Sequence, residues 1–472
     1  MNYVTTIFGA PGCGKTHYLL DLLEDLLKHY APDEIAFVSF TRQGSYEGRS
    51  RAMERFAYHS EQLPYFKTLH SLAFTGAGLS KSDIIQKAHY KEFSDLMGMN
   101  FTGYYTEDFN SDDDRLLFYY FLKKNNPALA EEIEGTINMG VYERVEMGYN
   151  KYKEVRGLVD YTDMLTFFLE SKQALPVKVA IIDEAQDLTT LQWQMCEIAF
   201  KNCEHVFVAG DDDQAIYEWN GADVNYFLSL KGDRVILDKS YRMPKEVLRF
   251  SKKIASLIAN RVPKEFAPRA IGGSVELYND LDEIPLKKNE TYYFLARTNW
   301  HLARFRTYFK ENGIVYTDKG NSSVSEKVVQ AIRAYEYFRK NGTFAEKEDA
   351  LLLTQLLIDP TNYKLPWYEN FVLDIEELNY YRDLVASKAD LLDRRFLVST
   401  IHGVKGGEAD NVVMLLDLTK NIETNFYTHR DSELRCFYVG CTRARKRVHL
   451  VASKSRRGYD SHLRIQNLLY GD

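Results

Sequence analysis

Several features that define common protein classes are missing from this sequence. Its five cysteines stand at positions 13, 196, 203, 436 and 441, with no CxxC pair and no histidine at metal-ligand spacing. This pattern argues against a zinc site and predicts reduced thiols, as in an intracellular protein. No stretch reaches about 18 uninterrupted apolar residues, and the N-terminus lacks a basic region followed by a long apolar run. We therefore expect neither secretion nor membrane insertion, and a cytoplasmic location.

An excess of positive charge is also lacking. The 60 lysines and arginines are outnumbered by 67 aspartates and glutamates, which gives a net charge of -7. This balance argues against a protein that coats nucleic acid through bulk positive charge, so any such binding must use a local groove. Aromatic residues are plentiful, with 33 Tyr and 27 Phe. A chain of 472 residues should hold about two to four compact units.

The first motif follows a short β-rich stretch at the N-terminus. Residues 3–8 read as a strand, residues 9–16 spell GAPGCGKT, and a helical stretch follows. In such a loop the glycines let backbone amides surround phosphates, Lys15 reaches the β and γ oxygens, and Thr16 offers a hydroxyl to Mg²⁺. A chance glycine-rich turn is the alternative, which the flanking strand and helix disfavour. The predicted nucleotide-binding loop comprises Gly9, Ala10, Pro11, Gly12, Cys13, Gly14, Lys15 and Thr16.

A second apolar stretch, residues 177–182, ends in two adjacent carboxylates. Asp183 could hold Mg²⁺ through water, and Glu184 could orient and deprotonate the attacking water of nucleotide hydrolysis. Acidic residues after a strand could instead favour a helix N-terminus. Together with the loop at Lys15, the catalytic interpretation is favoured.

Residues 210–222, GDDDQAIYEWNGA, follow a third apolar stretch. Gln214 could hydrogen-bond a nucleotide phosphate, while the rings of Tyr217 and Trp219 could stack on nucleic-acid bases. An acidic surface loop followed by a partly buried Trp is the alternative interpretation.

Three segments in the second half distinguish between classes of phosphate-loop protein. Residues 237–244, LDKSYRMP, present an aromatic ring at Tyr241, which suits a nucleobase, and a guanidinium at Arg242, which suits a γ-phosphate. Residues 396–408, FLVSTIHGVKGGE, read as a strand and a glycine turn, which alone could be a hairpin. Residues 433–447, ELRCFYVGCTRARKR, read as a helix with a basic end, which alone could be a terminal helix with cations at its negative pole.

In this order the segments resemble the UvrD, Rep and PcrA family of superfamily 1 DNA helicases along essentially the whole chain. GAPGCGKT resembles motif I, VSFTRQGSYE motif Ia, TLHSLAF motif Ib, IIDEAQD motif II, GDDDQAIYEWNGAD motif III, SYRMP motif IV, TIHGVKGGEAD motif V and YVGCTRARK motif VI. The 5′-to-3′ helicases of the superfamily usually carry a QLPPV-like continuation in motif III, which QAIYEWNGA does not match. The resemblance therefore favours the 3′-to-5′ branch.

The resemblance implies an α/β protein with two RecA-like motor domains built on parallel sheets, each interrupted by a mainly helical insertion. The expected segments are 1–67 and 174–238 for the first motor domain, 68–173 for its insertion, 239–320 and 395–472 for the second motor domain, and 321–394 for its shorter insertion.

The family also implies roles for individual residues. Gln214, Arg242 and Arg443 would contact the γ-phosphate, with Arg443 acting as an arginine finger. Tyr241 would stack on adenine and Glu408 would contact the ribose. The implied catalytic set is Lys15, Asp183, Glu184, Gln214, Arg242 and Arg443, with Thr16 and Asp183 at the metal. The implied nucleic-acid contacts are Phe40, Tyr217 and Trp219, and further Thr41, His70, Thr400 and His402, each of which could equally be a local cap or a packed polar residue.

The function so implied is an ATP- and Mg²⁺-dependent helicase that moves 3′ to 5′ on single-stranded DNA and unwinds duplex. Its expected partners are single-stranded DNA, 3′-tailed duplex and replication or recombination proteins, and we expect a monomer from a bacterium or a phage. Two alternatives stay open: a translocase that displaces proteins with weak unwinding, and an ATP-controlled nucleic-acid-binding switch. The chain begins almost at the first strand, without the upstream segment whose glutamine normally reads adenine, so nucleotide selectivity stays open too. So does unwinding strength, because the insertion 321–394 is far shorter than in the larger relatives.

Overall fold

The computed structural model describes residues 3–40, 42–105, 107, 111–269 and 272–471. The chain divides into two compact units, each assembled from three segments. The first unit contains Met1–Met243, Ile254–Ala270 and His429–Tyr438, and the second contains Pro244–Lys253, Ile271–Thr428 and Val439–Asp472. Both units combine helices with a mainly parallel sheet, so the predicted α/β class is confirmed.

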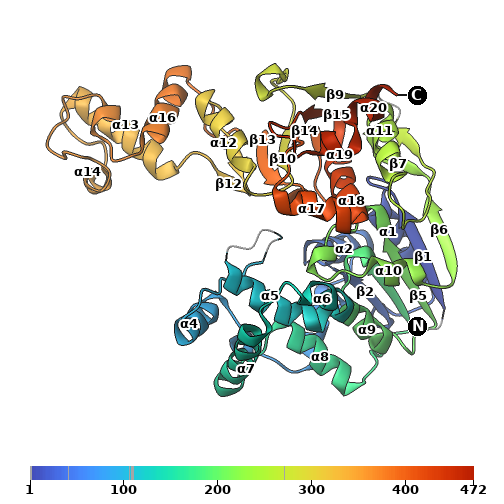
Figure 1. Cartoon of the computed structure of the whole chain (residues 1–472). Helices are drawn as coiled ribbons and strands as arrows, with labels where there is room; N and C mark the ends of the chain where they lie inside the picture. Colours follow the sequence, from blue (N-terminus) through green and yellow to red (C-terminus); the bar gives the residue numbers. More distant parts are fainter. Residues whose placement is uncertain (1–2, 41, 106, 108–110, 270–271, 472) are drawn as a thin grey trace. The chain divides into compact units, whose positions relative to one another are not determined.

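The first unit is built on a six-stranded parallel sheet with the strand order β3-β2-β4-β5-β1-β6 (Figure 1). Helices cover both faces, and β1, β2 and β4 are therefore buried along their whole length. One face packs on α1 (Lys15–Leu26) and α2 (Arg42–Phe56). The other packs on α3 (Leu69–Gly76), α8 (Tyr161–Ser171) and α9 (Thr190–Ala199). The strands are β1 (Val4–Gly9), β2 (Ile35–Ser39), β3 (Phe66–Thr68), β4 (Val179–Asp183), β5 (His205–Gly210) and β6 (Asp233–Leu237).

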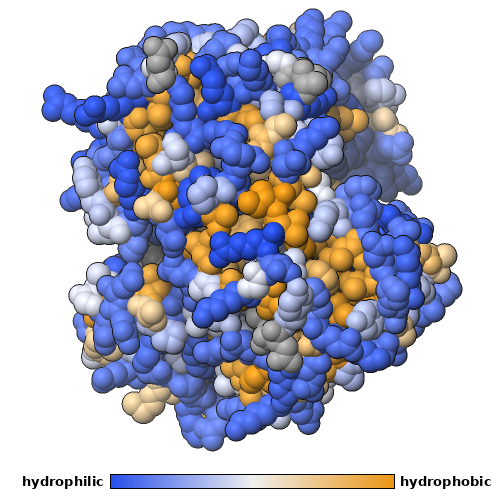
Figure 2. Space-filling view, turned by 90° about the vertical axis from the view of Figure 1, so that its right-hand side faces the viewer, coloured by the Kyte–Doolittle hydropathy of each residue, from blue (hydrophilic) through white to orange (hydrophobic). Residues whose placement is uncertain are grey.

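The edge strand β6 is the least covered strand of this sheet. Its Ile236 side chain is 42% exposed. Figure 2 shows the side of the molecule on which β6 lies in Figure 1, and hydrophobic side chains gather there among a hydrophilic surface.

The helices between β3 and β4 include a group with its own hydrophobic core. This core is rich in aromatic side chains, among them Phe93, Tyr120 and Tyr149, and is separate from the sheet cores. None of the helices in the described part of the chain is long and apolar enough to cross a membrane. The group consists of α4 (Lys87–Met97), α5 (Asp112–Asn125), α6 (Pro127–Glu134) and α7 (Met139–Arg156).

The second unit is built on a seven-stranded sheet with the order β12-β11-β13-β10-β14-β15-β9, in which only the β11–β12 pair is antiparallel among the described strands. A separate helical group with its own core follows β12. The strands are β9 (Ser274–Tyr278), β10 (Tyr292–Ala296), β11 (Thr317–Asp318), β12 (Asn321–Ser322), β13 (Phe396–Thr400), β14 (Ala409–Leu415) and β15 (Ala444–Val451). The helical group is α13 (Glu326–Asn341), α14 (Lys347–Thr354), α15 (Trp367–Asn370) and α16 (Ile375–Ser387).

The boundary between the units lies later in the chain than the expected position between 238 and 239. The first unit extends to Met243, because β7 (Lys239–Pro244) pairs with β8 (Ala267–Arg269) and the Tyr241 amide donates to the Gly12 carbonyl at 2.8 Å. The division into motor domains and insertions by residue number stays a prediction.

Helix α18 (Arg430–Cys441) contributes its residues up to Tyr438 to the first unit. The Arg435 guanidinium, 1% exposed, donates to Glu218 Oε2 at 2.9 Å and to the Asn260 carbonyl at 2.6 Å. The Asp431 carboxylate accepts from the amides of Ala259 and Asn260 at 3.0 and 2.9 Å. These contacts hold the start of α18 to two other segments of the first unit. One segment follows β5 and contains Glu218, and the other lies between β7 and β8 and contains Ala259 and Asn260.

Three consecutive carboxylates after β5 are completely buried. Asp211, Asp212 and Asp213 have no exposed surface, and the Lys264 ammonium pairs with all three, at 3.1 Å from Asp211 Oδ1 and 2.9 Å from Asp213 Oδ2. Arg261 binds Asp213 through two hydrogen bonds of 2.7 and 2.6 Å. Burial raises the pKa of Asp212, while Arg261 and Lys264 outweigh burial and lower the pKa of Asp213. The two cations make burial of this carboxylate cluster feasible.

Replacing Lys264 tests this balance. Lys264→Met leaves three buried carboxylates with one cation, so we expect the first unit to lose about 3–5 kcal/mol of unfolding free energy. Urea unfolding followed by circular dichroism measures the loss. The matched control is Lys151→Met, because Lys151 forms an exposed pair with Glu154 and its removal should change stability by less than about 1 kcal/mol. Equal effects of the two substitutions would contradict the assigned role of Lys264.

Candidate functional site

Three loops predicted to bind or hydrolyse nucleotide emerge from the same edge of the first sheet. They follow the carboxyl ends of β1, β5 and β4, and β5 lies between the other two strands. Ligands of open parallel sheets bind at this edge. The sheet order therefore brings the loop at Lys15, the carboxylates at Asp183 and Glu184, and Gln214 together.

The loop after β1 has the geometry of an anion-binding turn. Gly12 and Gly14 have φ angles of 70° and 79°, in the left-handed region that favours glycine, and α1 begins at Lys15. No side chain caps the start of α1, which leaves its first amides available to an anion. A side chain at Gly12 would also meet the chain that follows β6, since its Cβ would lie 2.3 Å from Arg242 Cβ.

Strand β7 supports this loop from outside. The hydroxyl of buried Ser240 donates to the Pro11 carbonyl at 2.8 Å, next to the contact between the Tyr241 amide and Gly12. Ser240 was not singled out from the sequence, and only its position beside Tyr241 and Arg242 could have indicated it. Tyr241 and Arg242, predicted to contact adenine and the γ-phosphate, thus lie directly against the phosphate loop.

The ring of Tyr241 is available to a ligand. It is 62% exposed, and the Lys239 ammonium lies 5.0 Å from its centroid. A Cβ on Gly14 would lie 3.6 Å from Tyr241 Cε2, so the ring stands at the mouth of the loop.

Lys15 and Glu184 form an ion pair across the carboxyl edge, with Nζ 3.2 Å from Oε1. Burial by itself would lower the pKa of Lys15, but the carboxylates of Glu184 and Asp183 outweigh burial and raise that pKa. Glu184 has a φ of 53°, an unusual value for a residue other than glycine that aims its side chain at a defined point. The pair keeps the lysine charged where phosphates would bind.

Asp183 and Thr16 fit a Mg²⁺ ion. Asp183 is 4% exposed and accepts the Glu184 amide at 2.9 Å, and burial together with the Glu184 charge raises the pKa of Asp183 to about 7. A divalent cation would favour the charged form of this buried carboxylate. The hydroxyl and carboxylate oxygens of the two residues are the hard donors that Mg²⁺ prefers.

Gln186 connects the two catalytic loops. Its amide nitrogen donates to Glu184 Oε2 at 2.6 Å, and its amide oxygen accepts the Asp211 amide at 3.0 Å. Gln214 Nε2 in turn donates to Asp211 Oδ2 at 2.7 Å. Glu184 and Gln214 are therefore linked through two buried residues that the sequence interpretation left without a role.

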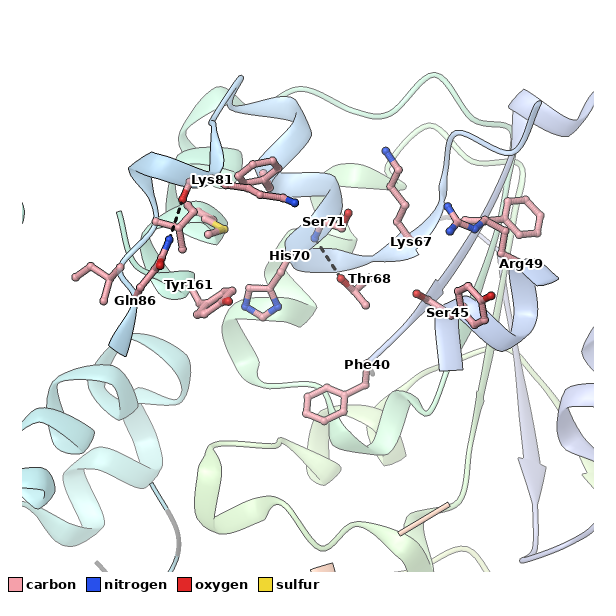
Figure 3. A pocket seen from close by; sticks show the side chains of 16 residues that line it. Phe40, Ser45, Arg49, Lys67, Thr68, His70, Ser71, Lys81, Gln86 and Tyr161 are labelled. Atoms are coloured by element: carbon pink, nitrogen blue, oxygen red, sulfur yellow. Dashed lines mark hydrogen bonds between the residues drawn. The ribbon is translucent and has the colours of Figure 1, made fainter. Parts of the chain in front are cut away.

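A groove of about 1170 Å³ lies on the first unit (Figure 3). Figure 3 shows His70 beside Tyr161, whose rings are 5.6 Å apart, with Phe40 below them. The Phe40 ring also lies 5.7 Å from that of Tyr217. Of the predicted nucleic-acid contacts, Phe40 and His70 thus line one groove, and Thr41 lies outside the described residues. The cations that line the groove are Arg49, Lys67 and Lys81.

Two other predicted contacts have structural partners. The Trp219 ring is partly buried and stacks on Phe118 of α5, with centroids 6.1 Å apart and an interplanar angle of 26°. Thr400 accepts the Gly403 amide at 3.2 Å, as a local cap does. Their contact with nucleic acid stays a prediction.

In the second unit, Arg443 is 1% exposed and is held by backbone carbonyls, Val439 at 3.1 Å and Gly407 at 3.4 Å. Glu408 pairs with Arg445 at 3.4 Å. His402 follows β13 in a short turn after Thr400. Of the four sequence-predicted residues of this unit, Thr400 is the last residue of β13, His402 and Glu408 lie between β13 and β14, and Arg443 lies between α18 and β15.

Comparison with known proteins agrees with this arrangement. Residues 1–234 match the UvrD/REP helicase N-terminal domain, and residues 292–455 match the UvrD-like helicase C-terminal domain. The chain is 23% identical over 385 residues to the ATP-dependent DNA helicase Rep of Buchnera aphidicola subsp. Baizongia pistaciae, covering 75% of this chain and 56% of that protein. It is 23% identical over 384 residues to Rep of Escherichia coli strain K12, with the same coverage of each chain.

A third relative is the ATP-dependent DNA helicase PcrA of Staphylococcus epidermidis, 21% identical over 350 residues, which cover 68% of this chain and 47% of that protein. The chain spans about half the length of the curated relatives it matches. With a phosphate loop, paired carboxylates and a buried arginine in the order of the two matching domains, this chain belongs to the UvrD/Rep/PcrA-like family of superfamily 1 helicases.

Proposed function

We propose that this protein is an ATP-driven DNA motor that moves 3′ to 5′ along single-stranded DNA and separates the duplex ahead of it. The observation that carries the proposal is the continuous link from Lys15 through Glu184, Gln186 and Asp211 to Gln214. It joins phosphate-binding, water-activating and phosphate-sensing groups at one sheet edge. Relatives named ATP-dependent DNA helicase support ATP and DNA as the ligands.

The chain's own residues divide the nucleotide chemistry among them. Lys15 and the amides of the phosphate loop bind the β and γ phosphates, and Glu184 orients the attacking water and takes its proton. Tyr241 stacks on adenine, Glu408 contacts the ribose, and Gln214, Arg242 and Arg443 bind the γ-phosphate. Thr16 and Asp183 would hold Mg²⁺, which when bound neutralises phosphate charge.

The groove of the first unit is suited to a single strand. Its rings can stack on bases of any sequence, and its cations can neutralise phosphates despite the net negative charge of the chain. Tyr217 lies three positions after Gln214, and its ring contacts that of Phe40, which lines this groove. The segment after β5 thus connects the phosphate-sensing amide to the strand path, to which we also assign His70, Trp219, Thr400 and His402.

A second candidate function is a translocase that displaces proteins from DNA with little unwinding. The observation that favours it is the small helical group α13–α16, which has a core of its own. The family resemblance leads us to expect a much larger subdomain at this place. An ATP-controlled binding switch is the remaining alternative.

Glu184→Gln tests the hydrolytic role. Without a general base, we expect turnover to fall about 10²- to 10⁴-fold while ATP binding persists. ATPase assays with and without oligothymidylate measure this, and wild-type turnover should rise when the strand is added. Glu170→Gln, an exposed change on α8, is the control that should retain wild-type turnover. A wild-type ATPase rate that does not change when single-stranded DNA is added would contradict the motor proposal.

Strand displacement on tailed duplexes tests direction. A motor that moves 3′ to 5′ reaches the junction from a 3′ tail and leaves it from a 5′ tail, so we expect unwinding of the 3′-tailed duplex only. Lys15→Ala should show none. Preference for the 5′ tail would overturn the direction, and DNA-stimulated ATPase without displacement would favour the translocase.

Tyr161→Ala tests the groove. Tyr161 is 49% exposed on the groove wall, and loss of one stacking ring should weaken oligothymidylate binding about tenfold without lowering the thermal midpoint. Fluorescence anisotropy measures the affinity. Tyr104→Ala removes a ring that is 65% exposed and does not line the groove, and this variant should bind as the wild type does. If both variants bound oligothymidylate with equal affinity, Tyr161 would not lie on the path of the single strand.

A further inference from the structure

The second unit presents an isolated tryptophan at the carboxyl edge of its sheet. Trp300 follows β10 in the turn before α12 (Leu302–Glu311) and is 79% exposed, the most exposed large hydrophobic side chain in the described part of the chain. By contrast, Trp193 and Trp367 are 0% and 5% exposed, and Trp219 is partly buried. An indole is seldom left so open to water without a ligand to cover it.

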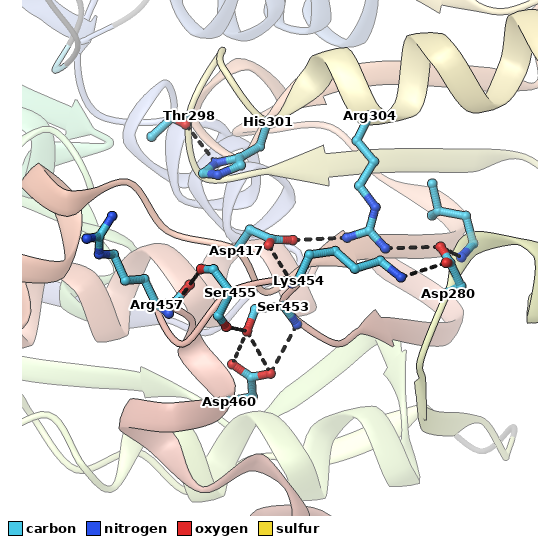
Figure 4. Close-up of polar contacts among 11 residues, drawn as sticks. Asp280, Thr298, His301, Arg304, Asp417, Ser453, Lys454, Ser455, Arg457 and Asp460 are labelled. Atoms are coloured by element: carbon cyan, nitrogen blue, oxygen red, sulfur yellow. Dashed lines mark hydrogen bonds and ion pairs between the residues drawn. The ribbon is translucent and has the colours of Figure 1, made fainter.

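The turn that carries Trp300 is held by two hydrogen bonds. Thr298, 2% exposed, shares a hydrogen bond of 3.0 Å with the His301 ring, so the residues on either side of Asn299 and Trp300 are tied together (Figure 4). The Ala296 carbonyl at the start of the turn accepts the Ile401 amide at 3.1 Å. This bond joins the turn to the loop between Thr400 and His402, which we assign to the strand path. Trp300 is thus held at the same sheet edge as those residues.

The neighbouring polar group also points to a ligand. The Asn299 side-chain oxygen is buried and has no hydrogen-bond partner among the described residues. A buried amide group without a partner is uncommon, because its desolvation is not compensated.

Acidic side chains at this edge are already neutralised. Asp417 pairs with Arg304 at 3.0 Å, and Asp280 pairs with Arg304 at 3.1 Å and Lys454 at 2.6 Å, as Figure 4 shows. Exposed cations follow β11, β14 and β15 at the same edge. They are Lys319, Lys420 and Arg456. The carboxyl edge that carries Trp300 therefore has paired carboxylates and several exposed cations, which suits a polyanion better than the apolar face of a protein partner.

We propose that Trp300 is a stacking platform for a base of single-stranded DNA that crosses the carboxyl edge of the second sheet. The inference rests on the proposed function and adds a contact in the second unit to those in the groove of the first. Stacking on an indole face is tolerant of base identity, so the platform would grip without reading sequence.

Affinity and fluorescence test the platform. Trp300→Ala should weaken oligothymidylate binding about tenfold, whereas Trp300→Phe should stay within about twofold of wild type. The slope of log affinity against log salt should be unchanged in Trp300→Ala, because stacking neutralises no phosphate. In a Trp219→Phe background the strand should quench tryptophan emission, and adding Trp300→Ala should abolish the quenching.

Tyr470→Ala is the matched control. Tyr470 is 76% exposed on α20 (Ile465–Tyr470), which packs by β9 at the far edge strand of the sheet, so its removal should leave binding unchanged. Thermal midpoints of the Trp300 and Tyr470 single variants should equal the wild-type value, since neither side chain is buried.

The outcomes separate this inference from the function it rests on. If wild-type protein fails to bind oligothymidylate, both are overturned. If wild type binds and shows DNA-stimulated ATPase but Trp300→Ala binds equally well, the proposed function stands and the platform is overturned, which leaves Trp300 to a protein-docking surface.

Discussion

The pairing of Lys264 and Arg261 with three buried carboxylates is the interaction on which the candidate nucleotide site depends. Asp211 accepts a hydrogen bond from the Gln214 side chain, and its amide donates to the Gln186 side chain. Both contacts require that residues 211–213 stay in place, and three buried like charges cannot stay there without cations. The side-chain amide of Gln186 in turn donates a hydrogen bond to the Glu184 carboxylate. The placement of the catalytic groups thus depends on a segment, residues 254–270, that itself contributes no residue to nucleotide chemistry.

The contacts around β5 also explain how one short segment could serve two ligands. Gln214 at one end is hydrogen-bonded at the nucleotide edge, while Tyr217 contacts Phe40, which lines the groove. Trp219 packs on α5 and Glu218 pairs with Arg435 of α18, so the segment after β5 contacts two different helices. A change at the phosphates would reach the groove through fewer than ten residues of chain. The negative net charge of the protein is no obstacle, because the cations that matter line the groove itself.

Local patterns were predicted well from the sequence, and distant contacts were not. The phosphate loop was recognisable because strand, glycines, lysine and helix are consecutive, and the order of motifs indicated the family that the domain matches confirm. The burial of Asp211–Asp213 was not foreseen, since an acidic run is normally solvated and its cations lie some fifty positions further on. Ser240 and Gln186 were missed for the same reason: each acts through a hydrogen bond to a residue far away in the chain. The pairing of β7 with β8, both largely in the first unit, was likewise not predicted, since the two strands are separated by more than twenty residues.

The assembly of the first unit from three segments has a consequence for biosynthesis. Its last segment runs from His429 to Tyr438, so the ribosome must have added this segment before Arg435 can reach Glu218 and Asp431 can reach the amides at 259 and 260. Until then the nascent first unit exposes those polar groups and the surface that α18 covers. Folding of this unit is therefore completed only after its third segment has been made, and no single cut in the polypeptide yields it as a contiguous fragment.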